Sequence, residues 1–205
     1  MKRLIAFFLF FISLAMPVSA DYWKTYRFPC EPDYILSIPS SYHVLYSGMP
    51  ENSPVLQSLG ITTKQAELSL EINNAFALIY SDDYSSFFSI AKFEDNSIYD
   101  YDELSSDELD ELAVIIGEQL KDQLETNSDI ILNSSECFAF ESDHARYITI
   151  ISQITLGSLE QILVQCVTTS NGYQIILTFN CANKEDIITK DMDTFQTIVE
   201  NFIPL

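Results

Sequence analysis

The alternation of hydrophobic and polar positions is most regular between Gln161 and Asn180, where two alternating runs flank Asn171-Gly172. Asn-Gly between such runs predicts a β-hairpin with a type I′ turn, because that turn needs positive φ at both central residues. A two-residue turn also fixes the register. The pairs expected on one face are Thr168 with Ile175, Cys166 with Leu177, Val164 with Phe179 and Ile162 with Cys181. Only Thr168 among them is polar, so this face is predicted to lie in the core.

The opposite face of the same hairpin has a mixed character. It is expected to be wet or only lightly covered, because polar and apolar side chains share it. Its members are Leu163, Gln165, Val167, Thr169, Gln174, Ile176, Thr178 and Asn180.

Further strands are predicted where short apolar runs end in turn residues. They are Tyr34–Ile38, Phe76–Tyr80, Phe87–Phe93, Cys137–Phe140 and Arg146–Leu156. The second and third should form a hairpin, because the residues between them favour turns. Segments 40–54 and 127–136 are expected to be loop or turn, with a short apolar run in the second. Strands adjacent in sequence tend to pair, which predicts a C-terminal meander of about four strands.

Two segments have the periodicity of amphipathic helices. The first begins at Ser105, which has capping-box spacing to Glu108. Asn183 is the expected cap of the second. Their apolar stripes are Leu109, Leu112, Ile116, Leu120 and Leu124 in the first, and Ile188, Met192, Phe195, Val199 and Phe202 in the second. Both helices are predicted to pack on a sheet. The side of the first helix that faces solvent is expected to be acidic.

Segment 62–74 supports two interpretations. Strict alternation of apolar and polar residues favours a strand. The spacing of Thr62 and Gln65 matches a capping box, and residues 64–71 lack β-branching, which favours a helix. A helix is preferred.

The N-terminus has the pattern of a secretory signal peptide. Lys2 and Arg3 precede an apolar run, and Val18-Ser19-Ala20 offers a cleavage site. The run is shorter than the roughly 20 residues that a membrane-spanning helix needs. We expect a signal peptide at 1–20, an extended lead-in at 21–33 and a single domain at 34–205. The mature protein is expected to be secreted or periplasmic, without stable membrane insertion.

The charge balance excludes some partners. The formal charge is −20, and removal of Lys2 and Arg3 would make it −22. Nucleic acids need a basic face on their partner, and so do anionic membranes, so neither is expected to bind. Apolar residues make up 47% of the chain and aromatic residues 13%, and this composition argues against disorder. The charge itself mainly indicates solubility.

Four cysteines, Cys30, Cys137, Cys166 and Cys181, permit two disulfides in an exported protein. The predicted register argues against a bridge between Cys166 and Cys181, because it places them about 13 Å apart along the strands. Disulfides join Cα atoms within about 7 Å. Any bridge is expected to involve Cys30 or Cys137, and buried free thiols are the alternative for the other two. No cysteine spacing matches a zinc site.

The order of the elements is informative about the fold family. A strand ends at Ile38-Pro39 shortly before Tyr42, and Gln165–Phe202 runs from a strand through Asn171-Gly172 to a closing amphipathic helix. This order resembles the PsbP-like superfamily, which includes photosystem oxygen-evolving subunits, a Ran-binding nuclear-import factor and DcrB-type bacterial envelope proteins. The resemblance implies an α+β fold, an antiparallel meander with amphipathic helices packed on it as an α/β/α sandwich. It implies no activity, because these relatives share a scaffold and not a chemistry.

Signs of catalysis are few. His43 and His144 are the only histidines, and no nucleophile-elbow motif accompanies them. A lone histidine is more often a packing or surface residue than a catalyst. An extracellular hydrolase would need a cleft in which one of them meets a carboxylate or a hydroxyl.

Calcium is the one cofactor that the sequence suggests. The acidic segment Glu94–Glu103 offers hard oxygen ligands, with Asp100, Asp102 and Glu103 as the candidates. It does not match an EF-hand, because Leu104 takes the next ligand position. A solvated acidic loop before a helix N-terminus is the alternative. The sequon at Asn133 matters only in a eukaryotic secretory pathway.

Two functions from different classes remain. The first is a noncatalytic, secreted or envelope-associated binding module. Its ligand surface would be the acidic loop and the backs of the helices, and its partner an unknown protein or basic ligand. The second is the extracellular hydrolase. The binding module is preferred because the sequence offers no catalytic motif.

Overall fold

The computed structural model describes residues 22–28, 33–82, 86–94, 100–125, 130–182 and 185–205. The predicted signal peptide, Cys30 and Asn183 lie outside these ranges. The larger sheet has seven antiparallel strands. In spatial order they are β3 (His43–Tyr46), β4 (Ala75–Tyr80), β5 (Ser86–Glu94), β9 (Tyr173–Ala182), β8 (Leu159–Ser170), β7 (Arg146–Leu156) and β6 (Ile130–Glu141).

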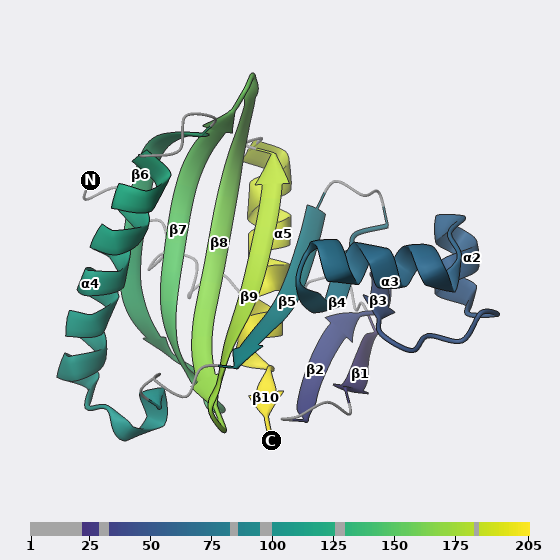
Figure 1. The fold of residues 1–205 in the computed structure, drawn as a ribbon, viewed down its shortest axis with the longest axis horizontal. Helices are drawn as coiled ribbons and strands as arrows, with labels where there is room; N and C mark the ends of the chain where they lie inside the picture. The colour runs from purple at the N-terminus through teal and green to yellow at the C-terminus, as the bar shows by residue number, and fades with distance from the viewer. Residues whose placement is uncertain (1–21, 29–32, 83–85, 95–99, 126–129, 183–184) are drawn as a thin grey trace.

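A smaller antiparallel sheet contains β1 (Trp23–Phe28), β2 (Tyr34–Pro39) and β10 (Ile203–Pro204), with β2 in the middle. The helices are α2 (Pro54–Leu59), α3 (Thr63–Ile72), the 3-10 turn η2 (Tyr101–Glu103), α4 (Ser106–Glu125) and α5 (Glu185–Glu200). Figure 1 shows α4 and α3 in front of the large sheet at its two ends, with α5 behind it. The α+β fold predicted from the sequence is confirmed.

The β8–β9 hairpin has the predicted register. Asn171 and Gly172 both have positive φ, 51° and 78°. All four predicted pairs are observed: Thr168 with Ile175, Cys166 with Leu177, Val164 with Phe179 and Ile162 with Cys181. All eight side chains are buried. This face of the hairpin therefore forms one side of the main core, as the alternation predicts.

The main core lies between the large sheet, α5 and the small sheet. Three phenylalanines stack at its centre: Phe88 of β5, Phe179 of β9 and Phe195 of α5, with ring centroids 5.0 to 5.7 Å apart. Tyr34 of β2 stacks on Phe202 at 5.5 Å, which joins the small sheet to the end of the chain. Aromatic pairs at these distances add about 0.5–1.5 kcal/mol each beyond burial. The last segment of the chain is thereby fixed to β2.

The opposite face of the large sheet has two smaller clusters. Under α2 and α3 lie Leu45 and Leu78, and under α4 lie Ile148 and Ile150. The helical interpretation of 62–74 is confirmed, because α3 occupies it and Thr62 with Gln65 forms the capping box. The predicted cap of α4 is also observed, since Ser105 and Glu108 exchange hydrogen bonds.

Two loop predictions are wrong. Segment 40–54 contains β3, which pairs with β4. Segment 127–136 is strand from Ile130 onward, because β6 continues to Glu141 beyond an irregularity in its pairing between Leu132 and Ser134. Alternation fails at that irregularity, and the polar residues after it gave a turn signal. Within the lead-in, which the sequence predicts to be extended, residues 23–28 form strand β1, and this strand pairs along its whole length with β2.

The cysteines within the described ranges, Cys137, Cys166 and Cys181, are free thiols. The argument against a bridge between Cys166 and Cys181 is confirmed by the register, which places Cys166 opposite Leu177. Burial raises the pKa of the Cys166 thiol to about 12 and that of the Cys181 thiol to about 11. Both therefore remain protonated at neutral pH and behave as small apolar side chains.

Helix α4 approaches β6 closely at Gly117. A Cβ atom at this position would lie 2.7 Å from the Cβ of Cys137. That neighbouring atom is attached directly to the strand backbone and cannot rotate away. The glycine therefore sets the spacing between α4 and β6.

We predict that Gly117→Ala lowers the stability of the protein. Alanine favours a helix by about 0.8–1.0 kcal/mol over glycine, but overpacking of this kind costs typically about 1–3 kcal/mol. The midpoint of urea unfolding should therefore fall. Glu118→Ala, an exposed change one residue away, should leave it nearly unchanged. An increased midpoint for Gly117→Ala would show that α4 is free to move away from the sheet.

Candidate functional site

The middle of the large sheet lies between the end that α2 and α3 cover and the end that α4 covers. One row of paired residues crosses all seven strands from β3 to β6, and its members share a face. In order they are Leu45, Leu78, Ser89, Thr178, Gln165, Ile150 and Cys137. The first two lie in the cluster under α2 and α3, and the last two in the cluster under α4. The three in the middle are polar and half-buried.

Neighbouring positions on the same face of the sheet add to this group of polar residues. Asn180 lies between Phe87 and Leu163 in the next row, and Gln161 follows along β8. We call these residues the amide strip, defined as Ser89, Gln161, Leu163, Gln165, Thr178 and Asn180. All six are half-buried. Figure 1 shows the strands that carry the strip, β8, β9 and β5, between α4 and α3.

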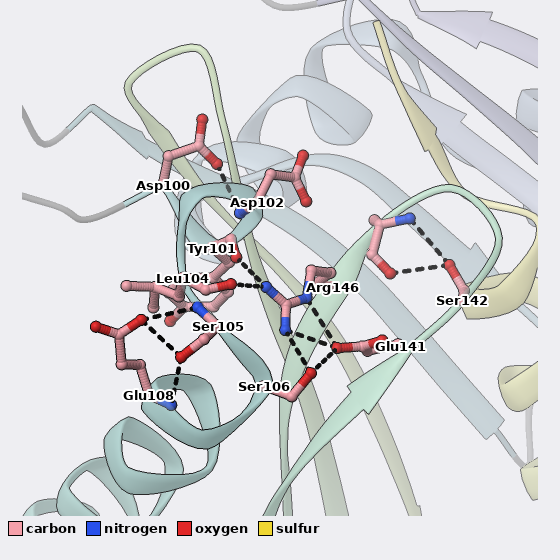
Figure 2. A network of polar contacts seen from close by, with 11 residues as sticks. Asp100, Tyr101, Asp102, Leu104, Ser105, Ser106, Glu108, Glu141, Ser142 and Arg146 are labelled. Atoms are coloured by element: carbon pink, nitrogen blue, oxygen red, sulfur yellow. Dashed lines mark hydrogen bonds and ion pairs between the residues drawn. The ribbon is translucent and has the colours of Figure 1, made fainter.

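Arg146 fixes the segment before α4. Its side chain is 16% exposed and donates to the backbone carbonyls of Tyr101 and Leu104. It also forms an ion pair with Glu141 at 2.6 Å. The hydrogen bonds from Arg146 to Glu141 lower the pKa of the Glu141 carboxyl, with further contributions from the Ser106 hydroxyl and the Arg146 charge. Figure 2 shows the guanidinium between the 3-10 turn and the end of β6.

The same segment is fastened to β8. The Tyr101 N–H donates to the Thr169 hydroxyl at 2.7 Å, and the Tyr101 side chain is buried. Burial raises the pKa of the Tyr101 phenol to about 12. The acidic residues that follow are therefore held on a fixed backbone.

Carboxylates dominate the outer surface from η2 along α4. Those described as exposed are Asp102, Glu103, Asp107, Glu108, Asp110, Glu111, Glu118 and Asp122, and the one basic residue in this span is Lys121. Two large apolar side chains lie among them, Val114 at 58% and Ile115 at 51% exposed. We call this surface the acidic face of α4.

The calcium candidates do not converge in the structure. The Asp100 carboxylate caps the 3-10 turn by accepting the Asp102 N–H at 3.1 Å, and it also accepts from Thr169 at 3.4 Å. Asp102 and Glu103 lie on the exposed side of the turn. In the described residues, no three carboxylate, histidine or cysteine side chains are grouped closely enough to hold a metal ion.

The two histidines have different surroundings. His43 is half-buried in β3, with its Nδ1 3.5 Å from the Ser58 hydroxyl and its Nε2 3.4 Å from an Asp82 carboxylate oxygen. Ser58 donates to the Val55 carbonyl at 2.8 Å. His144 is exposed in the β6–β7 turn, where its backbone N–H donates to Ser142. The structure thus brings one predicted candidate together with a hydroxyl and a carboxylate.

One buried carboxylate was not predicted from the sequence. Asp191 of α5 is 4% exposed and accepts hydrogen bonds from Tyr42 at 3.3 Å and from Ser86. These partners come from the β2–β3 connection and the start of β5. Asp191 ties α5 to both, which is a structural role. Its position beside the apolar stripe was the only available signal.

Comparison with solved structures identifies the fold. The solution structure of cyanobacterial PsbP (CyanoP) from Synechocystis sp. PCC 6803 matches with a TM-score of 0.50 and 15% identity, over 95% of this chain and 99% of that one. The chain has a PsbP-like fold. The family resemblance inferred from the strand, turn and closing helix is confirmed at the level of the fold.

Other matches are more distant. LpqN, involved in cell envelope biogenesis of Mycobacterium tuberculosis, aligns with a TM-score of 0.47 and 11% identity over 89% of this chain and 91% of that one. The Saccharomyces cerevisiae Ran-binding protein Mog1p gives 0.40 and 6%, over 89% and 95%. No model of a known family and no curated protein matches the sequence. The PsbP-like fold therefore brings no function with it.

We predict that Arg146→Met destabilises the protein by about 1–3 kcal/mol, because partly buried carbonyls lose their donor. Amide hydrogen exchange at residues 101–104 should accelerate. Arg27→Met is the matched control, because Arg27 is 67% exposed and its ion pair with Asp33 is of the kind worth about 0–1 kcal/mol. Equal effects of the two changes would contradict the role assigned to Arg146.

Calcium binding at Asp100, Asp102 and Glu103 stays a prediction. Thermal unfolding in calcium, magnesium or chelator at constant high ionic strength tests it, because salt removes general screening effects. A rise in midpoint selective for calcium would indicate a native-state site. Equal midpoints would remove the hypothesis.

Proposed function

We propose that the protein is an extracytoplasmic, noncatalytic binding protein whose partner presents a basic surface. The observation that carries this proposal is the acidic face of α4, where exposed carboxylates surround Val114 and Ile115. A field of one sign accelerates encounter with a partner of opposite sign. The two apolar side chains supply area that a partner would bury.

The rigidity of this surface supports the proposal. Arg146 and Thr169 fasten the 3-10 turn to the sheet, and the Ser105–Glu108 capping box fixes the start of α4. A surface that is already ordered loses less conformational entropy on binding. The carboxylates are therefore arranged for recognition before a partner arrives.

The extracytoplasmic location is supported by the N-terminal sequence pattern of a charged pair, an apolar run and small residues before Asp21. Among the helices in the described part of the chain, none has the length and apolarity to cross a bilayer.

The proposal is tested by neutralising the acidic face without changing its shape. The variant carries Asp110→Asn, Glu111→Gln, Glu118→Gln and Asp122→Asn. The control neutralises four exposed carboxylates elsewhere, Glu51→Gln, Glu71→Gln, Glu94→Gln and Asp143→Asn. Partners captured from the extracytoplasmic fraction should be lost by the first variant and kept by the control.

Purified partner should then bind the wild type with an affinity that falls as salt rises. Binding that both variants retain equally would contradict the assignment of this surface.

A hydrolase is the second candidate, because His43 lies between Ser58 and Asp82. In that function Ser58 would be the nucleophile, His43 the base and Asp82 the group that orients it. A fluorophosphonate probe should then label wild-type protein and fail to label Ser58→Ala and His43→Gln. Absence of labelling in the wild type would leave the binding protein as the one remaining candidate function.

A further inference from the structure

The amide strip is unusual in its lack of charge. Strands β8 and β9 carry a single charged residue between them, Glu160, near the start of β8. The whole chain nevertheless has a formal charge of −20. A sheet face that only has to remain soluble in such a protein is free to carry carboxylates. This one carries carboxamides and hydroxyls instead.

The polar groups of the strip can both donate and accept hydrogen bonds. Gln161, Gln165 and Asn180 each offer an amide NH2 and a carbonyl oxygen, and Ser89 and Thr178 each offer a hydroxyl. The Asn180 amide donates to the Gln161 carbonyl oxygen at 3.5 Å, at the outer limit of such interactions. Within the part of the chain that the structure describes, the strip therefore retains hydrogen-bonding capacity for an incoming ligand.

Apolar side chains lie beside these polar groups. Leu163 and Phe87 flank Asn180 in one row across β8, β9 and β5. Phe87 is fixed by its contact with Tyr80, with ring centroids 5.1 Å apart. A ligand that matches this surface is uncharged, has hydroxyl and amide groups, and also has apolar C–H faces that rest on a ring or a leucine.

We propose that the amide strip binds a neutral glycan that contains N-acetylated sugars. Its hydroxyl and acetamido groups would exchange hydrogen bonds with Gln165 and Asn180, and its C–H faces would rest on Leu163 and Phe87. This site goes beyond the proposed function, because it lies on the sheet between the helices and not on the acidic face of α4. Anionic glycans are disfavoured by the overall charge.

The test uses N,N′,N″-triacetylchitotriose, titrated into the full mature chain and followed by calorimetry and by amide chemical shifts. Saturable binding with shifts at Gln165, Thr178 and Asn180 is expected. Gln165→Leu and Asn180→Leu should each weaken binding by roughly two- to tenfold, the effect of one lost hydrogen bond. Gln153→Leu is the matched control, because Gln153 is half-buried on the other face of the neighbouring strand β7.

The proposal is overturned by absence of binding at millimolar trisaccharide, or by equal affinity for the wild type and both strip variants. Binding of an uncharged extended peptide to the strip in place of the glycan would also overturn it. The variant neutralised on the acidic face of α4 should bind the trisaccharide like the wild type. Failure of the partner experiment and failure of this one are therefore separate results.

Discussion

The register of the β8–β9 hairpin is the constraint on which the rest of the structure depends. Side chains alternate between the two faces of a strand, so a shift by one residue would exchange the buried and exposed sets. Asn171 and Gly172 prevent that shift because they accept the positive φ that a two-residue turn demands. With the register set, Phe179 meets Phe88 and Phe195, while Gln165 and Asn180 face away from the main core. The core and the amide strip are thus two results of one turn.

Two polar ties join segments that are distant in sequence. Asp191 accepts hydrogen bonds from Tyr42 and Ser86 inside the main core. At the end of the sheet, Arg146 donates to backbone carbonyls and pairs with a carboxylate. Such groups are costly to bury unless they are satisfied, so they favour one arrangement over other packings of the same apolar residues. The first holds α5 in place on one face. The second holds the start of α4 on the other.

Local sequence patterns were sufficient to predict the elements that have a strong pattern. The Asn171-Gly172 turn, the Ser105 cap and the Thr62–Gln65 box each act over a few residues, and each was predicted. Strand β3 is four residues long and exists because β4 pairs with it, so 43–46 carried little signal of its own. The amide strip could be anticipated only as a mixed face, because its exposure depends on where α3 and α4 stop. The contact of His43 with Ser58 and Asp82 depends on tertiary structure alone.

The irregularity in β6 has a consequence for association between molecules. In the larger sheet, β6 is an outer strand of twelve residues, and such an edge is a template on which another chain can pair. The register shift between Leu132 and Ser134 interrupts the row of backbone groups, and the exposed Asn133 adds a polar side chain beside it. By this argument, the polar residues that conceal the strand in the sequence also make its edge a poorer template for another chain.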